Sequence, residues 1–248
     1  MCIVKTIFSQ SGDSMKYFNI TLISFNLLVF ISCSNKPREH PDYSKANIAY
    51  DSGDYKTAID EYTKVIEKFP EEFLPYYFRG SARFNSSDYE GAMADYTKVL
   101  ELRDDNFLAY DGRGWCSFEL KKYAKAKDDF RKSFEIKPLY AESISNLGYV
   151  FFMEGQIDSA LFYYNLAVER DPKCLMALFN RAQTYDSLKK YSAAIDDYSS
   201  ILAIDSANYQ IYSLRGKMKE KAEDRAGAKD DYKLAAEFEM QHNDKLKK

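Results

Sequence analysis

The sequence predicts an all-α protein, a right-handed α-solenoid built from six tandem helix hairpins, and three observations support this. Alanine recurs every 34 residues, an aromatic residue lies four positions after each alanine, and a small residue lies twelve positions before it. Glycine and proline are few, 10 and 6 in 248 residues, which argues against a loop-rich β fold. A short helix hairpin cannot bury its apolar stripe alone, so neighbouring hairpins are expected to stack into one continuous core.

The repeat holds over six copies without an insertion. The alanines are Ala58, Ala92, Ala126, Ala160, Ala194 and Ala228. The aromatic residues are Tyr62, Tyr96, Phe130, Tyr164, Tyr198 and Tyr232, and the small residues are Ala46, Gly80, Gly114, Gly148, Ala182 and Gly216. Residues four apart share one face of a helix, and small residues let two helices approach closely. Each unit is therefore expected to fold as two packed helices.

This pattern resembles the tetratricopeptide repeat, whose unit of 34 residues folds as two antiparallel helices. In that frame the units span residues 39–72, 73–106, 107–140, 141–174, 175–208 and 209–242, and residues 243–248 form a polar C-terminal tail. The resemblance covers 204 of the 248 residues, six units of 34, and leaves little chain for another domain.

A charge pattern runs inside the repeat. Unit position 7 is basic and position 23 is acidic in five units, whereas the fourth unit has Leu147 and Tyr163 there. Because both charges are lost together, we expect the two positions to meet as ion pairs between the helices of a unit. The predicted pairs are Lys45–Glu61, Arg79–Asp95, Arg113–Asp129, Arg181–Asp197 and Arg215–Asp231. The alternative is a row of basic residues that binds phosphate or carboxylate ligands.

The resemblance also implies a ligand groove. In the tetratricopeptide family the first helix of each unit lines a concave groove through unit positions 2, 5, 9, 12 and 13. The residues that we select from these positions are Tyr77, Phe84, Asp111, Trp115, Phe118, Tyr149, Phe152 and Phe179. Aromatic anchors of this kind suit a peptide or helix ligand. The alternative is that several of these rings pack between neighbouring units.

The N-terminal segment has the layout of a secretory signal. Lys16 precedes an apolar run at residues 17–31, and this run is shorter than the roughly 20 residues that a membrane helix needs. Residues 30–33, Phe-Ile-Ser-Cys, resemble a bacterial lipobox, which implies cleavage before Cys33 and a lipid on its sulfur. We expect a signal peptide at 1–32, in which 1–14 is either a mis-assigned start or an unusual leader, and a lipid-anchored tether at 33–38. Alternatively, Cys33 is incidental to an ordinary secretion signal or an uncleaved anchor.

The remaining motifs favour binding over catalysis. We find no catalytic constellation, so we expect no enzyme activity, and two histidines with four scattered cysteines predict no metal and no cofactor. We expect Cys116 and Cys174 to be packing residues. The net charge of −3 argues against nucleic-acid binding.

The expected function is that of a non-enzymatic scaffold or adaptor lipoprotein, which binds partner proteins or peptides in its concave groove. We expect it to be anchored to a membrane of the bacterial envelope, and we favour the outer membrane. The alternatives are a self-associating structural envelope protein, hence a homo-oligomer, or a lipoprotein that binds small ligands or glycans.

Overall fold

A computed structural model describes residues 41–246 of the chain. The predicted signal peptide, Cys33 and the predicted tether lie outside the described residues. Within residues 41–246, no helix has the length and apolar character needed to cross a membrane.

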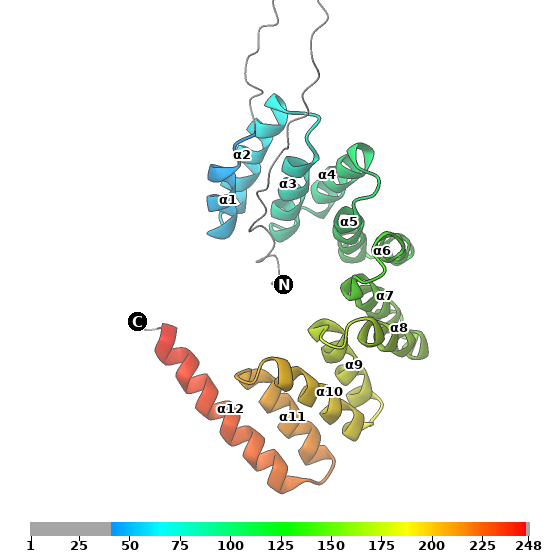
Figure 1. The fold of residues 1–248 in the computed structure, drawn as a ribbon, viewed down its shortest axis with the longest axis vertical. Helices are drawn as coiled ribbons and strands as arrows, with labels where there is room; N and C mark the ends of the chain where they lie inside the picture. Colours follow the sequence, from blue (N-terminus) through cyan, green and yellow to red (C-terminus); the bar gives the residue numbers. More distant parts are fainter. Residues whose placement is uncertain (1–40, 247–248) are drawn as a thin grey trace, which may run out of the picture. The chain divides into compact units, whose positions relative to one another are not determined.

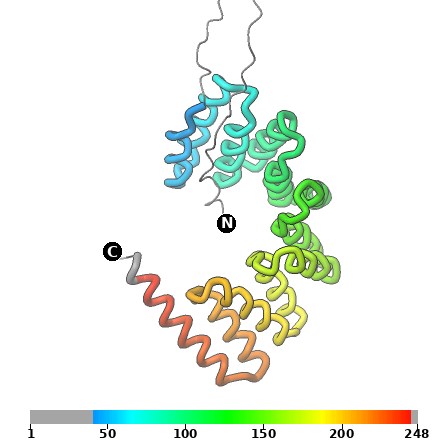
Figure 2. The backbone as a smooth tube through the Cα atoms, viewed as in Figure 1, coloured from blue at the N-terminus to red at the C-terminus, as the bar shows by residue number. Residues whose placement is uncertain are grey.

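Twelve α-helices and no strand occur in the described part of the chain, as the all-α prediction requires (Figure 1). Their bounds are α1 (Ser44–Asp51), α2 (Tyr55–Lys68), α3 (Phe73–Asn85), α4 (Tyr89–Leu102), α5 (Phe107–Glu119), α6 (Tyr123–Ile136), α7 (Ala141–Met153), α8 (Ile157–Arg170), α9 (Leu175–Ser187), α10 (Tyr191–Ile204), α11 (Tyr209–Lys221) and α12 (Arg225–Leu246). The chain passes from one helix pair to the next in sequence order, which gives the predicted α-solenoid (Figure 2). Helices α3, α5, α7, α9 and α11 each begin at the first residue of a repeat unit.

The turn between the two helices of a pair has the same backbone geometry in all six units. Unit position 15 adopts a positive φ each time, at Gly53, Ser87, Lys121, Gly155, Lys189 and Glu223, with values from 57° to 80°. Only glycine adopts this left-handed conformation without steric cost, so four of the six turns contain a strained side chain. Asp54 and Asp88 follow two of these turns and cap the next helix by accepting a backbone N–H bond.

The small residue at unit position 8 makes room for the aromatic ring at position 24 of the same unit. A Cβ atom added to Gly148 would lie 2.8 Å from Tyr164 Cε1, and one added to Gly114 would lie 2.8 Å from Phe130 Cε1. These rings are among the largest fully buried side chains. The spacing of 16 residues between small and aromatic positions therefore encodes the close packing of the two helices.

The core runs through the described helices as a series of apolar clusters, each shared by consecutive helices. The repeated alanines Ala58, Ala92, Ala126, Ala160 and Ala194 are fully buried at the contacts between paired helices. Cys116 and Cys174 are buried free thiols, and burial raises the pKa of Cys116 to about 12. Such thiols are inert packing residues, as predicted.

Candidate functional site

Four of the five predicted ion pairs form, and they share one geometry. In Arg79–Asp95, Arg113–Asp129, Arg181–Asp197 and Arg215–Asp231, the arginine Nε donates to Oδ2 at 2.9–3.0 Å and Nη2 donates to Oδ1 at 2.6–2.7 Å. The carboxylates are buried between the paired helices. This bidentate arrangement holds both charges in the interior of the repeat, so they are not available as a ligand-binding row.

The prediction of a fifth pair, Lys45–Glu61, is wrong, because these two side chains do not form an ion pair. Glu61 instead bonds Lys64, three residues later on the same helix, at 2.6 Å. Lys45 acts on Glu61 only as a more distant charge. The physical reason is that Lys45 is exposed on α1, the first and shortest helix described, and a lysine lacks the guanidinium fork that spans two helices.

The fourth unit replaces the ion pair by an apolar contact. Leu147 is 1% exposed and shares an apolar cluster with Tyr163, whose ring stacks on Phe151 at 5.2 Å. A surface pair compensates at this junction: Lys127 of α6 bonds Glu154 at 2.8 Å and lies over the Phe151 ring. The joint loss of both charges in the sequence thus corresponds to the replacement of one ion pair by one apolar contact.

Each of these arginines also makes a third contact that the sequence reading missed. Its Nη1 atom donates to a polar side chain sixteen residues earlier, on the last helix of the preceding unit. The acceptors are Thr63, Thr97, Asn165 and Ser199, at 3.0, 3.5, 2.8 and 3.1 Å. One arginine therefore joins three helices and two units. Polar residues recurring at unit position 25 were the available signal.

Two of the buried carboxylates hold a second cation. Arg83 Nη1 donates to Asp95 Oδ2 at 2.9 Å, and Lys219 Nζ lies 3.0 Å from Asp231 Oδ2. Both cations occupy unit position 11, one turn after the first arginine. Burial alone would raise the pKa of Asp231, but the hydrogen bonds from Arg215 and Lys219 outweigh it and lower that pKa below its ordinary value.

The odd-numbered helices lie side by side and are bridged by hydrogen bonds between residues 35 apart. Asn85 donates to the Tyr50 hydroxyl at 2.9 Å, Asn146 to Asp111 at 2.9 Å and Asn180 to Ser145 at 3.5 Å, and Lys221 bonds Asp186. We call the surface that carries the eight predicted groove residues on α3, α5, α7 and α9 the odd-helix face. The sequence reading did not anticipate these bridges, although Asn146 and Asn180 share unit position 6.

The eight predicted residues are partly buried on this face, and none is fully exposed. Trp115, Phe118 and Tyr149 form one aromatic cluster across α5 and α7, with ring centroids 5.3–6.0 Å apart. Three other rings pack mainly on the second helix of their own unit: Tyr77 on Tyr96, Phe84 on Tyr89 and Phe179 on Tyr198. Phe152 has no ring contact among the described aromatic residues, so its ring is the least constrained of the set.

Asp111 differs from the other seven because it is a charged residue within this aromatic face. Its Oδ1 accepts from Ser143 Oγ at 3.0 Å and from Asn146 Nδ2 at 2.9 Å, and Ser133 and Ser143 are 2.7 Å apart. Burial raises the pKa of Asp111 to about 6, against the lowering effect of these hydrogen bonds. The network lies at the same junction where Leu147 and Tyr163 replace the ion pair.

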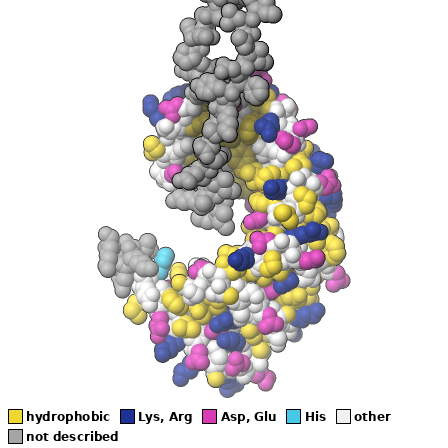
Figure 3. Space-filling view, in the orientation of Figure 1, with side chains coloured by type: hydrophobic (Ala, Val, Ile, Leu, Met, Phe, Trp, Pro, Cys, Tyr) yellow, Lys and Arg dark blue, Asp and Glu magenta, His cyan; other side chains and the backbone are white. Residues whose placement is uncertain are grey.

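Two surface hollows lie elsewhere. One of about 640 Å³ is formed by α4, α5 and α6 around Met93 and Arg113, and one of about 450 Å³ is formed by α11 and α12 around Tyr209 and His242. Neither is lined by the eight predicted residues. On the face shown in Figure 3, basic and acidic side chains are interspersed. Among residues 41–246, no three His, Cys, Asp or Glu side chains are grouped to hold a metal ion.

Comparison with known proteins agrees with this geometry. A profile described as Tetratricopeptide repeat matches residues 43–107 and 145–209, and a second profile of that description matches 108–138. A curated relative, the tetratricopeptide repeat and J domain-containing co-chaperone DNJ1 of Fusarium oxysporum, is 38% identical over 85 residues, which are 33% of this chain and 16% of that protein. Stress-induced-phosphoprotein 1 of Caenorhabditis elegans is 34% identical over 71 residues, 29% of this chain and 22% of that protein. The matched region thus spans less than a quarter of either relative.

Solved structures show the same fold. The crystal structure of MamA is 22% identical with a TM-score of 0.57, covering 66% of this chain and 96% of that one. The crystal structure of YrrB, described as a TPR protein with an unusual peptide-binding site, is 25% identical with a TM-score of 0.52, covering 75% of this chain and 95% of that one. The fold supports a role as a protein-interaction scaffold. On its repeat pattern, its helix pairs and these matches, the chain belongs to the tetratricopeptide repeat family.

Proposed function

We propose that this chain is a non-enzymatic scaffold that binds segments of partner proteins on its odd-helix face, at the bacterial cell envelope. The observation that carries the proposal is the aromatic cluster of Trp115, Phe118 and Tyr149, whose rings remain partly accessible although they touch one another. Aromatic side chains that are held rigid by their neighbours lose little entropy on binding and act as anchors for a partner.

Two further observations support this choice of surface. The hydrogen bonds between residues 35 apart tie the odd-numbered helices together, so the face is preorganised and does not have to be ordered by the partner. The arginine and aspartate charges that recur in four units are paired inside those units, which leaves the aromatic residues as the chemically distinctive feature of this surface. YrrB, which shares the fold at 25% identity, is described as having a peptide-binding site.

The location is proposed from the sequence. Cys33 follows a short apolar segment in a lipobox-like context, and lipidation there would leave a short polar tether before α1. A lipid on Cys33 would hold the helices close to a membrane. This part of the proposal does not depend on the binding surface and is tested separately.

Quantitative affinity capture from envelope extracts tests the binding surface. The parent chain is compared with the double variant Trp115→Ala/Phe152→Ala and with Phe162→Ala, which removes an exposed ring from α8 instead. We expect captured proteins to be lost with the double variant and retained with Phe162→Ala. Equal capture by all three chains would refute the odd-helix face as the binding surface. Circular dichroism checks folding, and Phe152→Ala alone serves if Trp115→Ala unfolds the chain.

A further inference from the structure

Asp111 is held on the odd-helix face without a cation. Its Oδ1 is fixed by Ser143 and Asn146 of the neighbouring helix α7, whereas Oδ2 has no hydrogen-bond partner among residues 41–246 and is not a fully buried atom. No Lys or Arg nitrogen of the described residues lies within 4.0 Å of it. The carboxylates Asp95, Asp129, Asp197 and Asp231 each pair with an arginine, whereas no Lys or Arg of the described residues forms an ion pair with Asp111.

The orientation of Asp111 is maintained at a cost to the fold. Asn146 is 1% exposed, and its Oδ1 is a buried acceptor with no hydrogen-bond partner in the described part of the chain. Turning the amide over would bring Oδ1 against the carboxylate of Asp111, so Nδ2 stays on Asp111 and Oδ1 stays unsatisfied. A buried carbonyl without a hydrogen-bond partner destabilises the folded state. The unsatisfied carbonyl of Asn146 is thus the consequence of holding the Asp111 carboxylate in one position. An acid held in this way is suited to bind a ligand.

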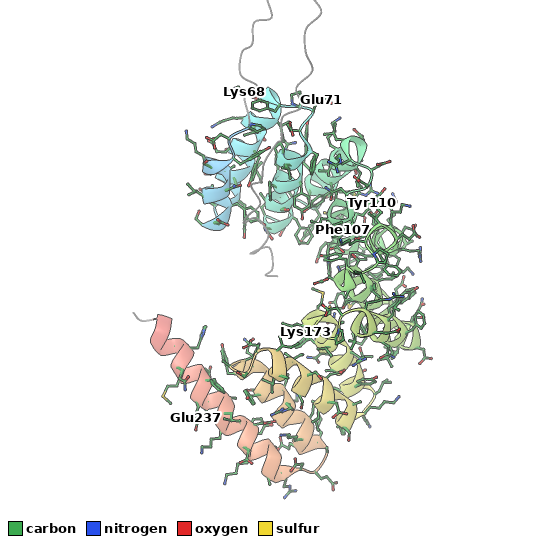
Figure 4. All side chains as sticks on the ribbon, in the orientation of Figure 1. Lys68, Glu71, Phe107, Tyr110, Lys173 and Glu237 are labelled. Atoms are coloured by element: carbon green, nitrogen blue, oxygen red, sulfur yellow. The ribbon has the colours of Figure 1, made fainter. Side chains whose placement is uncertain are left out.

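Aromatic residues flank this acid along α5. Phe107, labelled in Figure 4, and Trp115 lie four residues before and after Asp111 on α5, so the three side chains follow one face of that helix. The ring of Tyr140 packs against Phe107 at 5.0 Å. The charge of Asp111 helps to raise the pKa of the Tyr77 and Tyr140 hydroxyls, second to burial.

An acid among aromatic rings suits a cation that is partly removed from water. An ammonium or guanidinium group gains from the carboxylate and from the faces of aromatic rings at once. Glu142, which also acts on Asp111, adds a second negative charge, so an anionic or purely apolar group would be disfavoured there. Serine occupies the equivalent unit position in the next repeat, where Asn180 bonds Ser145, so the acid is specific to the third unit.

From this geometry we infer that Asp111 is the specificity-determining residue of the odd-helix face and receives a lysine or arginine side chain of a bound partner segment. The inference rests on the proposed function. The rings of Trp115 and Tyr149 would hold apolar residues of the same segment, and Asp111 would select segments with a basic residue at the matching position.

Peptide selection tests this inference on the full chain, purified in detergent. A phage-displayed library of random dodecapeptides is selected on the parent, on Asp111→Asn and on Glu119→Gln, and the selected peptides are then tested for binding to Trp115→Ala. Asparagine keeps an acceptor for Ser143 and Asn146 while removing the charge, and Glu119→Gln makes the same charge change eight residues later on α5, at an exposed position. We expect peptides with Lys or Arg at one fixed position from the parent and from Glu119→Gln, and loss of that preference with Asp111→Asn.

Calorimetry on one selected peptide then measures the coupling free energy between its basic residue and Asp111. Replacing its basic residue by norleucine should weaken binding to the parent roughly tenfold and leave binding to Asp111→Asn unchanged. Peptides that depend on Trp115 but carry no basic residue, or that bind Asp111→Asn equally, would overturn the inference and leave the proposed function standing. Absence of any peptide that depends on Trp115 would overturn both. A dimer of the parent that dissociates with Asp111→Asn would identify the occupant as a second copy and also refute a partner segment.

Discussion

Arg79 holds Asp95 through two parallel hydrogen bonds, from Nε to Oδ2 at 2.9 Å and from Nη2 to Oδ1 at 2.6 Å, while its Nη1 reaches Thr63 of the preceding unit at 3.0 Å. The same residue thus closes its own helix pair and attaches it to its neighbour. Because the arrangement recurs in four units, the ion pairs are a structural element of the solenoid and determine how its units are joined.

Removing one such arginine should destabilise the protein strongly. Arg181→Met leaves Asp197, which is 4% exposed, as a buried charge and also releases Asn165. We expect a loss of about 3 kcal/mol in the free energy of unfolding, measured by urea denaturation. Lys64→Met, which breaks an exposed pair with Glu61, should change it by less than about 1 kcal/mol. Equal effects of the two substitutions would contradict the account of the arginines.

The fourth unit supplies a second test of the same contact. In the fourth unit, Leu147 and Tyr163 occupy the two positions that are charged in the other units. The double variant Arg181→Leu/Asp197→Tyr places the same two residue types in the fifth unit. The double variant should be more stable than the sum of the two single substitutions requires, by about 1–3 kcal/mol in a double-mutant cycle. Additive losses would mean that the apolar exchange depends on features of the fourth unit alone.

The strained turns offer stabilising substitutions. Lys189 has a φ of 57°, and Gly155 has a φ of 76° at the same unit position. Lys189→Gly should raise the free energy of unfolding by about 0.5–1 kcal/mol, because relief of the left-handed strain exceeds the entropy that glycine adds to the unfolded chain. Gly155→Ala should lower it by about 1 kcal/mol. Thermal melts of both variants measure the effect, and a lower melting temperature for Lys189→Gly would refute the strain.

Asp111 gives the protein a specific pH dependence. Its pKa in the folded protein, about 6, lies above the ordinary value of 3.8, so the ionised form opposes folding. This penalty is complete above about pH 6, diminishes as the pH falls towards 3.8 and is absent below that. Asp111→Asn should therefore stabilise the protein at pH 7, by up to about 3 kcal/mol, and by much less near pH 4. A stability difference that grew towards pH 4 would indicate a paired carboxylate instead.

The proposed anchor makes a chemical prediction. Mass spectrometry of the protein extracted from cells should find Cys33 as the first residue with a lipid on its sulfur. Cys33→Ser should abolish the modification and release the chain from the membrane fraction, since a serine cannot form the thioether. An unmodified Cys33 followed by the intact chain would refute the lipoprotein proposal.

The sequence was sufficient for the architecture because its spacing reflects packing. The 16 residues between Gly148 and Tyr164, and the joint loss of charge at Leu147 and Tyr163, each correspond to one contact between paired helices. Contacts between units were harder to infer. The bonds from Asn146 to Asp111 and from Arg181 to Asn165 join different units. The residue types at these positions change from unit to unit, so the only periodic signals were the polar residues at unit position 25 and the asparagines at unit position 6 of two units. The Lys45–Glu61 prediction was wrong for the opposite reason. Lys45 follows the charge pattern of the repeat, but it is exposed on the short helix α1, and a lysine lacks the guanidinium group that spans two helices.

Site-specific photo-cross-linking in the cells that produce this protein tests the central claim most directly. A photoreactive phenylalanine replaces Tyr149, within the aromatic cluster of the odd-helix face, or Phe162, an exposed ring on α8 of the same unit. The account predicts defined cross-linked partners from position 149, reduced by Trp115→Ala, and none from position 162. Cross-links from position 162 alone, or equal cross-linking from both positions, would contradict it.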